Sequence, residues 1–111
     1  MSLVSKAQKI RTALTGITDL KVYHLTVPAG TKAPYAVWQE DSEGQSMHAD
    51  DQKIEQVLEV TIDYFTKTEY DAMTDTIQGA LNDARIAWRL NSFQYEEEAA
   101  LLHYEWLCRV I

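Results

Sequence analysis

With 111 residues, 46% of them hydrophobic, the chain can bury one hydrophobic core and is too short for two ordinary domains, so we expect a single domain over residues 1–111. Its formal net charge of −7 opposes non-specific binding to nucleic acid, and the single cysteine, Cys108, excludes an intramolecular disulfide and an all-cysteine metal site. No segment resembles a signal peptide or is apolar over the length of a membrane span, which predicts a cytoplasmic protein with no membrane contact.

A helix and then a short strand are the first two predicted elements. Apolar residues recur at spacings of three and four over residues 2–14, and Gly16 follows at the position where a left-handed residue commonly ends a helix. Residues 20–27 alternate weakly between apolar and polar side chains and stop at the turn sequence Pro28-Ala29-Gly30. We expect the helix to be amphipathic and the strand to be short.

Two stronger strands follow, separated by a polar segment. Residues 35–40 are rich in aromatic and β-branched side chains and predict a strand. The polar residues 41–53 predict a long, solvated loop. Residues 58–64 alternate strictly, which places apolar side chains on one face of a third strand and polar side chains on the other.

A second amphipathic helix is predicted from Tyr70 to about Ala84. The sequence Thr68-Glu69-Tyr70-Asp71 resembles a capping box with Asp in place of Glu, and apolar residues continue at helical spacing to Ala84. Because residues 85–90 contain no helix breaker, a helix that continues through Trp88 is an open alternative.

The last predicted element is a β-hairpin of residues 86–95 and 100–111 across an acidic turn. Alternation in its second strand points Cys108 inward, where a cysteine acts as a small apolar residue. The predicted fold class is therefore α+β. It consists of a mostly antiparallel sheet of about five strands with two helices on one face, in the order α-β-β-β-α-β-β.

Residues that could carry chemistry do not form a known motif. The acidic segment 41–51 lacks the alternating ligands of an EF-hand calcium loop, and the three histidines lack the spacing of a zinc site. The sequence contains neither a nucleophile motif nor a glycine-rich phosphate loop, although Asp63 and Glu105 could meet across strands. We therefore expect no enzyme, no metal ion and no cofactor.

Four segments form a pattern of structure without a catalytic signature. They are Lys32-Ala33-Pro34-Tyr35-Ala36-Val37-Trp38, residues 59–67, Ile86-Ala87-Trp88-Arg89-Leu90 and His103-Tyr104-Glu105-Trp106. With these segments the chain resembles, over most of its length, the small tail-terminator or tail-completion proteins of long-tailed phages and prophages.

The resemblance implies a structural virion assembly protein at the head–tail neck. Such a protein forms a ring, expected to be a hexamer, that caps the tail tube and joins it to a head completion or connector protein. DNA would pass through the ring without specific binding, and an acidic lumen would repel its phosphates. The protein would occupy the host cytoplasm during assembly and then the virion. Tail terminator and head-side completion protein are both compatible with the sequence.

Two acidic segments are candidate assembly or lumen surfaces, because long loops on a rigid sheet commonly carry contacts. Their carboxylates are Asp41, Glu43, Asp50, Asp51, Glu96, Glu97 and Glu98. Two other functions compete with this one. The first is a small α+β ligand-binding domain or enzyme with a pocket between sheet and helices. The second is an acidic adaptor that mimics nucleic acid and blocks a host factor.

Overall fold

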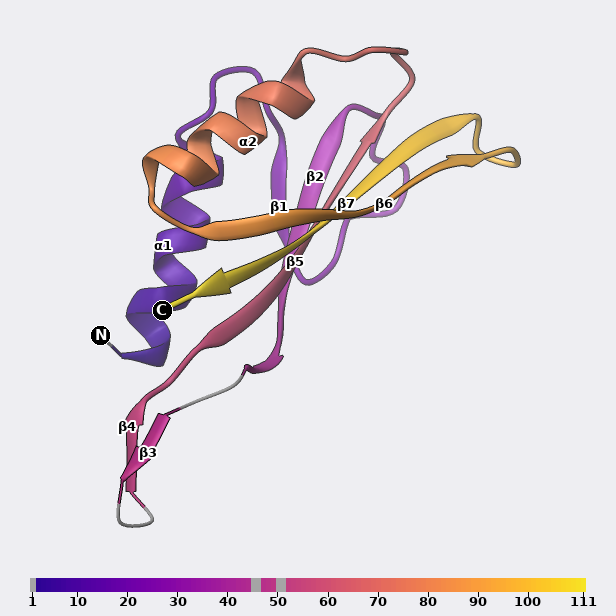
Figure 1. Cartoon of the computed structure of the whole chain (residues 1–111). Helices are drawn as coiled ribbons and strands as arrows, with labels where there is room; N and C mark the ends of the chain where they lie inside the picture. Colours follow the sequence, from indigo (N-terminus) through magenta and orange to yellow (C-terminus); the bar gives the residue numbers. More distant parts are fainter. Residues whose placement is uncertain (1, 45–46, 50–51) are drawn as a thin grey trace.

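In the computed structural model, residues 2–44, 47–49 and 52–111 are described, and they form a sheet covered by two helices, with a small hairpin projecting from it (Figure 1). The elements in chain order are α1 (Leu3–Thr15), β1 (Val22–His24), β2 (Tyr35–Glu43), β3 (Met47–Ala49), β4 (Gln52–Glu55), β5 (Leu58–Thr66), α2 (Met73–Asp83), β6 (Ala87–Glu96) and β7 (Leu101–Val110).

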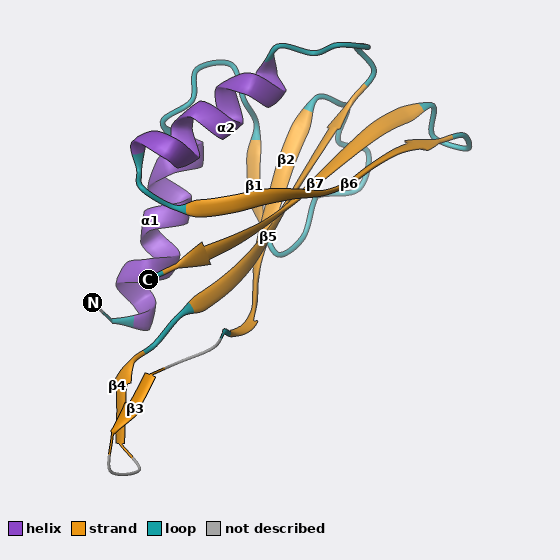
Figure 2. Cartoon of the chain, viewed as in Figure 1, coloured by secondary structure: helices purple, strands orange, loops and turns teal. Residues whose placement is uncertain are grey.

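The main sheet has five strands in the order β1-β2-β5-β7-β6. Only the β1–β2 pair is parallel, and the other three pairs are antiparallel. Both helices lie on the same side of this sheet (Figure 2). The predicted α+β class, the mostly antiparallel sheet and the placement of the two helices are confirmed.

Helix α1 begins and ends where the sequence indicates. The hydroxyl of Ser2 accepts a hydrogen bond of 3.0 Å from the amide of Ser5, which satisfies one of the free amides of the first turn. Ile10 and Leu14 are fully buried. Gly16 ends the helix, but its φ of −75° is right-handed, so the predicted left-handed cap is wrong. Its amide donates to Thr12 O over 3.1 Å, which closes the last turn without a left-handed residue.

Strand β5 is the central element of the sheet. Its side chains alternate between buried and half-buried along all nine residues, as the sequence predicts. Val60 and Ile62 are fully buried against the helices, and Glu59, Thr61 and Asp63 face the other way. The alternation therefore separates one apolar face from one polar face.

The second helix starts three residues later than predicted, and the predicted capping box is absent. Tyr70 is 90% exposed with φ +56°, and helix α2 begins at Met73. The reason is that Asp71 binds the sheet as well as the helix. Its carboxylate accepts hydrogen bonds from the hydroxyls of Tyr64 (2.6 Å) and Thr66 (2.7 Å) and from the amide of Met73 (2.9 Å).

Helix α2 ends at Asp83, so the alternative of a helix through Trp88 is excluded. Arg85 has φ +58°, a left-handed conformation that turns the chain into β6. Trp88 lies in β6 and donates from its indole nitrogen to Asn82 Oδ1 over 2.8 Å. The end of the helix and the start of the strand are thereby joined.

The predicted long loop over residues 41–53 is wrong. Strand β2 continues to Glu43 through a register shift between Glu40 and Ser42, because its pairing with β5 continues past that point. Strands β3 and β4 then pair with one another as a separate two-stranded unit. The first predicted strand is also shorter than expected, since only Val22–His24 pairs with β2 and Leu25 has φ +71°.

The core lies between the two helices and the inner face of the sheet. Trp106 is fully buried and donates from its indole nitrogen to Gln78 Oε1 of α2 over 3.0 Å. Cys108 is buried, as predicted. The buried cluster consists of Ile10, Leu14, Ala36, Trp38, Leu58, Val60, Ile62, Tyr64, Ile77, Leu81, Ile86, Trp106, Cys108 and Val110.

Replacing Asp71 by Asn should lower the free energy of unfolding by about 1–3 kcal/mol at pH 7. The two hydroxyls donate to Oδ2 and the Met73 amide donates to Oδ1, and an Asn side chain has only one oxygen to accept hydrogen bonds. Partial burial acts to raise the pKa of Asp71, but the hydrogen bonds from Tyr64, Thr66 and the Met73 amide outweigh it and hold the pKa below 3.8. Because the pKa of Asp71 is lower in the folded than in the unfolded protein, its ionised carboxylate stabilises the fold at pH values above the unfolded pKa. The difference in unfolding free energy between the two proteins should therefore shrink as the pH falls below about 4.

Urea unfolding at pH 7 and pH 3.5 measures this difference. The matched control is Asp75→Asn, which alters an exposed carboxylate in the first turn of the same helix. Equal effects of the two substitutions at pH 7 would contradict the role given to Asp71.

The Cys108 thiol should be unreactive in the folded protein. Burial, with a smaller contribution from the charge of Asp41, raises the pKa of Cys108 to about 12. The thiolate fraction at pH 8 is then about one in ten thousand. We expect reaction with a colorimetric disulfide reagent to be at least about 100-fold slower than in 6 M guanidinium. Equal rates in the two conditions would show that the strand opens.

Candidate functional site

The face of the main sheet turned away from the helices carries most of the acidic side chains of the strands. We call it the acidic face and define it by the carboxylates of Asp41, Glu59, Asp63, Glu96 and Glu105. The alternation of β5 and β7 puts Glu59, Asp63 and Glu105 there, because each alternates with a residue of the core. Asp41 joins them from the register shift of β2, and Glu96 from the end of β6. No helix covers this face (Figure 2).

His103 of β7 lies between two carboxylates of the acidic face. Its Nε2 is 2.7 Å from Asp63 Oδ1 on β5, and its Nδ1 is 3.2 Å from Glu96 Oε1 at the end of β6. The imidazole also stacks on Phe65, with 4.2 Å between ring centroids. His103 therefore links three strands, and a ring protonated on both nitrogens would donate to both carboxylates.

The carboxyl group of Asp63 has a raised pKa. Burial raises its pKa above the ordinary value of 3.8, and the hydrogen bond from His103 opposes this rise without cancelling it. The negative charges of Glu105 and Asp41 add to the rise. These effects show that the carboxylates lie close enough to interact electrostatically.

The remaining carboxylates are also held by neighbours. Asp41 accepts hydrogen bonds from the hydroxyl of Thr61 (2.5 Å) and from the side-chain amide of Gln39 (3.1 Å). Glu105 accepts from the side chain of Asn91 over 2.7 Å. The face is therefore a fixed network and not a set of free acids.

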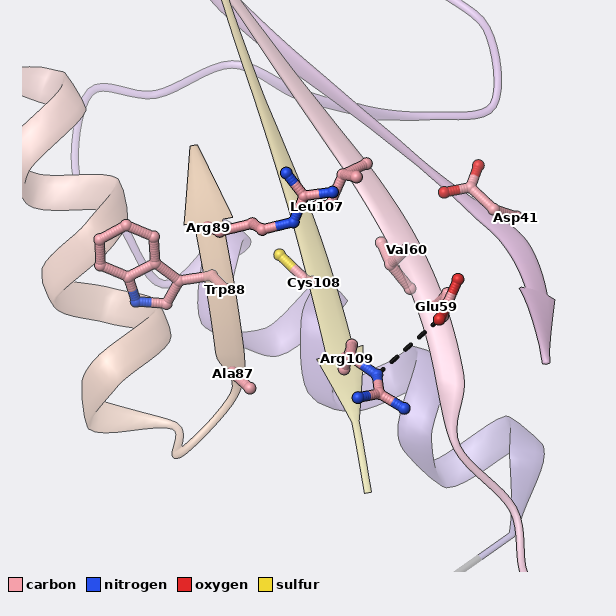
Figure 3. A pocket seen from close by; sticks show the side chains of 9 residues that line it. All are labelled: Asp41, Glu59, Val60, Ala87, Trp88, Arg89, Leu107, Cys108 and Arg109. Carbon is pink, nitrogen blue, oxygen red and sulfur yellow. Dashed lines mark ion pairs between the residues drawn. The ribbon is translucent and has the colours of Figure 1, made fainter. Parts of the chain in front are cut away.

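Two arginines border a shallow hollow at one end of this face. Figure 3 shows Arg109 reaching from β7 toward Glu59 on β5, with Nε 3.8 Å from the carboxylate oxygen. Arg89 of β6 and Leu107 of β7 also line the hollow, whose volume is about 230 Å³. This volume is below the range of ordinary ligand pockets, so we regard the hollow as a contact surface.

The structure brings some of the predicted site residues together and leaves others apart. Asp41 and Glu96 belong to the acidic face, whereas Glu43 lies at the end of β2 and accepts from Gln56 over 3.1 Å. Glu97 and Glu98 lie in the exposed turn between β6 and β7. The predicted residues Asp50 and Asp51 lie outside the described residues.

Sequence reasoning missed the centre of the acidic face. Asp63 and Glu105 are direct partners in the β5–β7 register, as considered from the strand pattern, but His103 was not connected with them. The available signal was the alternation in both strands, which puts all three side chains on the polar face. Their pairing depends on a register between residues about forty positions apart, which the sequence does not state.

The chemistry open to this cluster is limited. One ligand atom each from Asp63, His103 and Glu105 lie within 4.8 Å of one another, so the three groups could in principle surround a cation. A cation bound at His103 Nε2 would have to replace its hydrogen bond to Asp63, and Glu105 is held by Asn91. Hydrogen bonding within the cluster accounts for the observed geometry.

Together, these features define a protein with an α+β fold in which two helices cover one sheet face and a polar network occupies the other. No family model matches the sequence, and no curated protein is similar to it. The structure is similar to a chain described as "Virion of native gene transfer agent (GTA) particle", with a TM-score of 0.52 and 18% sequence identity. The similarity covers 95% of this chain and 89% of that chain, and it shows a shared fold. Among the described residues, neither helix is long and apolar enough to cross a membrane.

Replacing Asp63 by Asn should leave the melting temperature at pH 7 equal to or above that of the unaltered protein. The pKa of Asp63 is raised in the folded protein, so its contribution to stability is fully present below the unfolded pKa and is lost as the pH rises. An amide is neutral at every pH and does not incur that loss, and its oxygen can still accept from His103.

Thermal melting of both proteins between pH 3 and pH 8 tests this expectation. The difference between them should close toward pH 3, where the carboxyl group is itself neutral. Glu69→Gln removes an exposed charge elsewhere and should give no such trend. A variant at Asp63 that is clearly less stable at pH 7 would show that the charged pair with His103 outweighs the cost of burial.

Proposed function

We propose that this chain is a structural virion assembly protein at the head–tail neck of a long-tailed phage or prophage. The observation that carries the proposal is the similarity of fold, over nearly the whole of both chains, to a chain of a gene transfer agent virion. The resemblance in sequence to small tail-terminator or tail-completion proteins supports the same role.

In this role the chain assembles as a hexameric ring that caps the tail tube and joins it to a head completion or connector protein. The assembly takes place in the host cytoplasm, and the ring then becomes part of the virion. A ring of identical chains needs a heterologous contact, in which one surface of a chain meets a different surface of its neighbour. The exposed hairpins and sheet edges of this fold are suitable for such contacts.

The acidic face is our proposed lining of the ring lumen. Its five carboxylates outnumber the arginines that share the face, Arg89 and Arg109. A negative surface repels the phosphates of passing DNA and discourages binding during transit. The hydrogen bonds that hold Asp41, Asp63 and Glu105 fix these charges in place.

The alternative of a ligand-binding domain or enzyme requires a pocket between the sheet and the helices. The side chains at this interface, among them Ile10, Ile77 and Leu81, are fully buried in one cluster. The hollow between α1 and the β1–β2 edge of the sheet, of about 280 Å³, and the hollow on the acidic face, of about 230 Å³, are both smaller than ordinary ligand pockets. No specific observation favours this alternative or the acidic adaptor.

Native mass spectrometry with the tail-tube protein from the same gene cluster tests the proposed function. We expect a species of about six chains, alone at high concentration or bound to the tube end. Deletion of the gene should leave filled heads and free tails that do not join, and the unaltered gene should restore joining. A chain that stays monomeric and does not bind the tube would contradict the proposal.

A variant of the acidic face separates assembly from DNA passage. Changing Glu59 and Glu105 to Gln removes two negative charges without changing side-chain size, so rings should form normally. Double-stranded DNA should then be retained more strongly by the ring at low salt, and the difference should disappear at high salt. Unchanged DNA retention would argue against the lumen assignment.

A further inference from the structure

We propose that two surfaces at opposite ends of this chain bind one another in successive copies. The first, the hairpin surface, consists of Phe93, Tyr95, Glu97 and Glu98. The second, the helix groove, is lined by Leu3, Val4, Ala7, Gln8, Arg11, His24, Trp38 and Glu40. The inference specifies the contact that the proposed ring requires, and the occupant of each surface is a second copy of this chain.

The hairpin surface exposes large apolar side chains that the core does not use. Phe93 and Tyr95 are 54% and 59% exposed, and Leu90, which precedes this surface in the same strand, is 45% exposed. They pair with Trp106, Tyr104 and Leu102 of β7, so they point to the helix side of the sheet, beyond the region that the helices cover. Phe93 is held in place by stacking on Tyr104 at 4.6 Å. Exposed aromatic groups held in a fixed position are typical of contact surfaces.

The helix groove is a mainly apolar depression of about 280 Å³ between α1 and the β1–β2 edge of the sheet. Leu3 is 48% exposed and Val4 is 64% exposed, although both are apolar. The floor is Trp38, which is stacked on His24 at 3.9 Å. This volume suits one or two inserted side chains better than a whole small molecule.

The charges beside the two surfaces are opposite. Helix α1 contains Lys6, Lys9 and Arg11 and no acidic residue, in a chain with a net charge of −7. Lys6 is buried and donates to the backbone carbonyl of Gln56. Arg11 lines the helix groove, where the acidic Glu40 is paired with His24, and Lys9 lies on a neighbouring part of the helix. Within the described part of the chain, neither Lys9 nor Arg11 forms an ion pair.

The acidic partners lie in the turn of the hairpin. Glu97 and Glu98 are exposed and form no ion pair with another described residue, whereas Glu96 is engaged by His103. The hairpin surface thus combines aromatic side chains with unpaired carboxylates, and the helix groove combines aliphatic side chains with a neighbouring positive charge. Apolar contact would supply affinity, and the charges would fix orientation and discourage other pairings.

The chain cannot satisfy this contact within itself. The end of the β6–β7 hairpin and helix α1 lie on opposite sides of the molecule (Figure 1). Contact between two different surfaces is heterologous, and repetition closes a ring when the rotation between copies allows it. Both halves of the match lie on this one chain, which favours a second copy over an unrelated partner.

A mixing experiment tests the pairing directly. Val4→Asp puts a charge in the helix groove, and Tyr95→Asp puts one in the hairpin surface. Both side chains are more than half exposed, so both variants should fold, and circular dichroism checks that they do. Each variant alone should remain monomeric. A 1:1 mixture retains one intact contact, so native mass spectrometry should show a dimer of one chain of each kind and nothing larger.

Charge reversal gives a second, independent readout. Lys9→Glu with Arg11→Glu, or Glu97→Lys with Glu98→Lys, should each raise the concentration needed for assembly by roughly tenfold or more at low salt. All four changes in one chain should restore assembly. Glu69→Lys with Asp83→Lys is the matched control, since it reverses two exposed acids that belong to neither surface.

The outcomes separate this inference from the proposed function. Rings on the tail tube that form normally from every variant would overturn the contact and leave the neck function standing. A mixed dimer from a chain that ignores the tube would support the contact and contradict the neck function. A chain that does not self-associate in any condition would overturn both.

Discussion

Burial of one face of strand β5 is the constraint on which the rest of this structure depends. β5 is paired on both sides, with β2 and β7, and its inner side chains lie under the helices. Each large apolar side chain that it buries contributes roughly 1.5–3 kcal/mol, so a slip of one residue would expose the whole set. The register of β2 and β7 is fixed as a result, and so is the direction of every outward side chain.

The acidic face is a consequence of that register. Asp63, His103 and Glu105 meet because their neighbours in β5 and β7 must point into the core. Grouping carboxylates on a half-buried surface costs free energy, which the hydrogen bonds from His103, Thr61 and Asn91 partly offset. The core does not need this arrangement, and this supports our proposal that the face lines the ring lumen.

Charge is distributed along the molecule in a way that orients it. The basic helix α1 lies on one side and the acidic turn at Glu97 and Glu98 on the other, in a chain whose total charge is strongly negative. In the proposed contact, the basic helix of one copy meets the acidic turn of the next, so that the charges favour a head-to-tail orientation. The two proposals are compatible in one fold, because the acidic face and the two contact surfaces lie on different parts of the molecule.

The sequence by itself determined the fold class, the alternation of β5 and β7 and the buried Cys108, because each follows from a local periodic pattern. It also indicated two residues of the acidic face, Asp41 and Glu96, but not the centre of that face. Only the tertiary structure decided that Asp71 delays helix α2 by binding Tyr64 and Thr66, that β2 extends to Glu43 and that His103 joins Asp63 to Glu96. These features rest on partners brought together by strand register and packing, and local sequence patterns do not specify such partners.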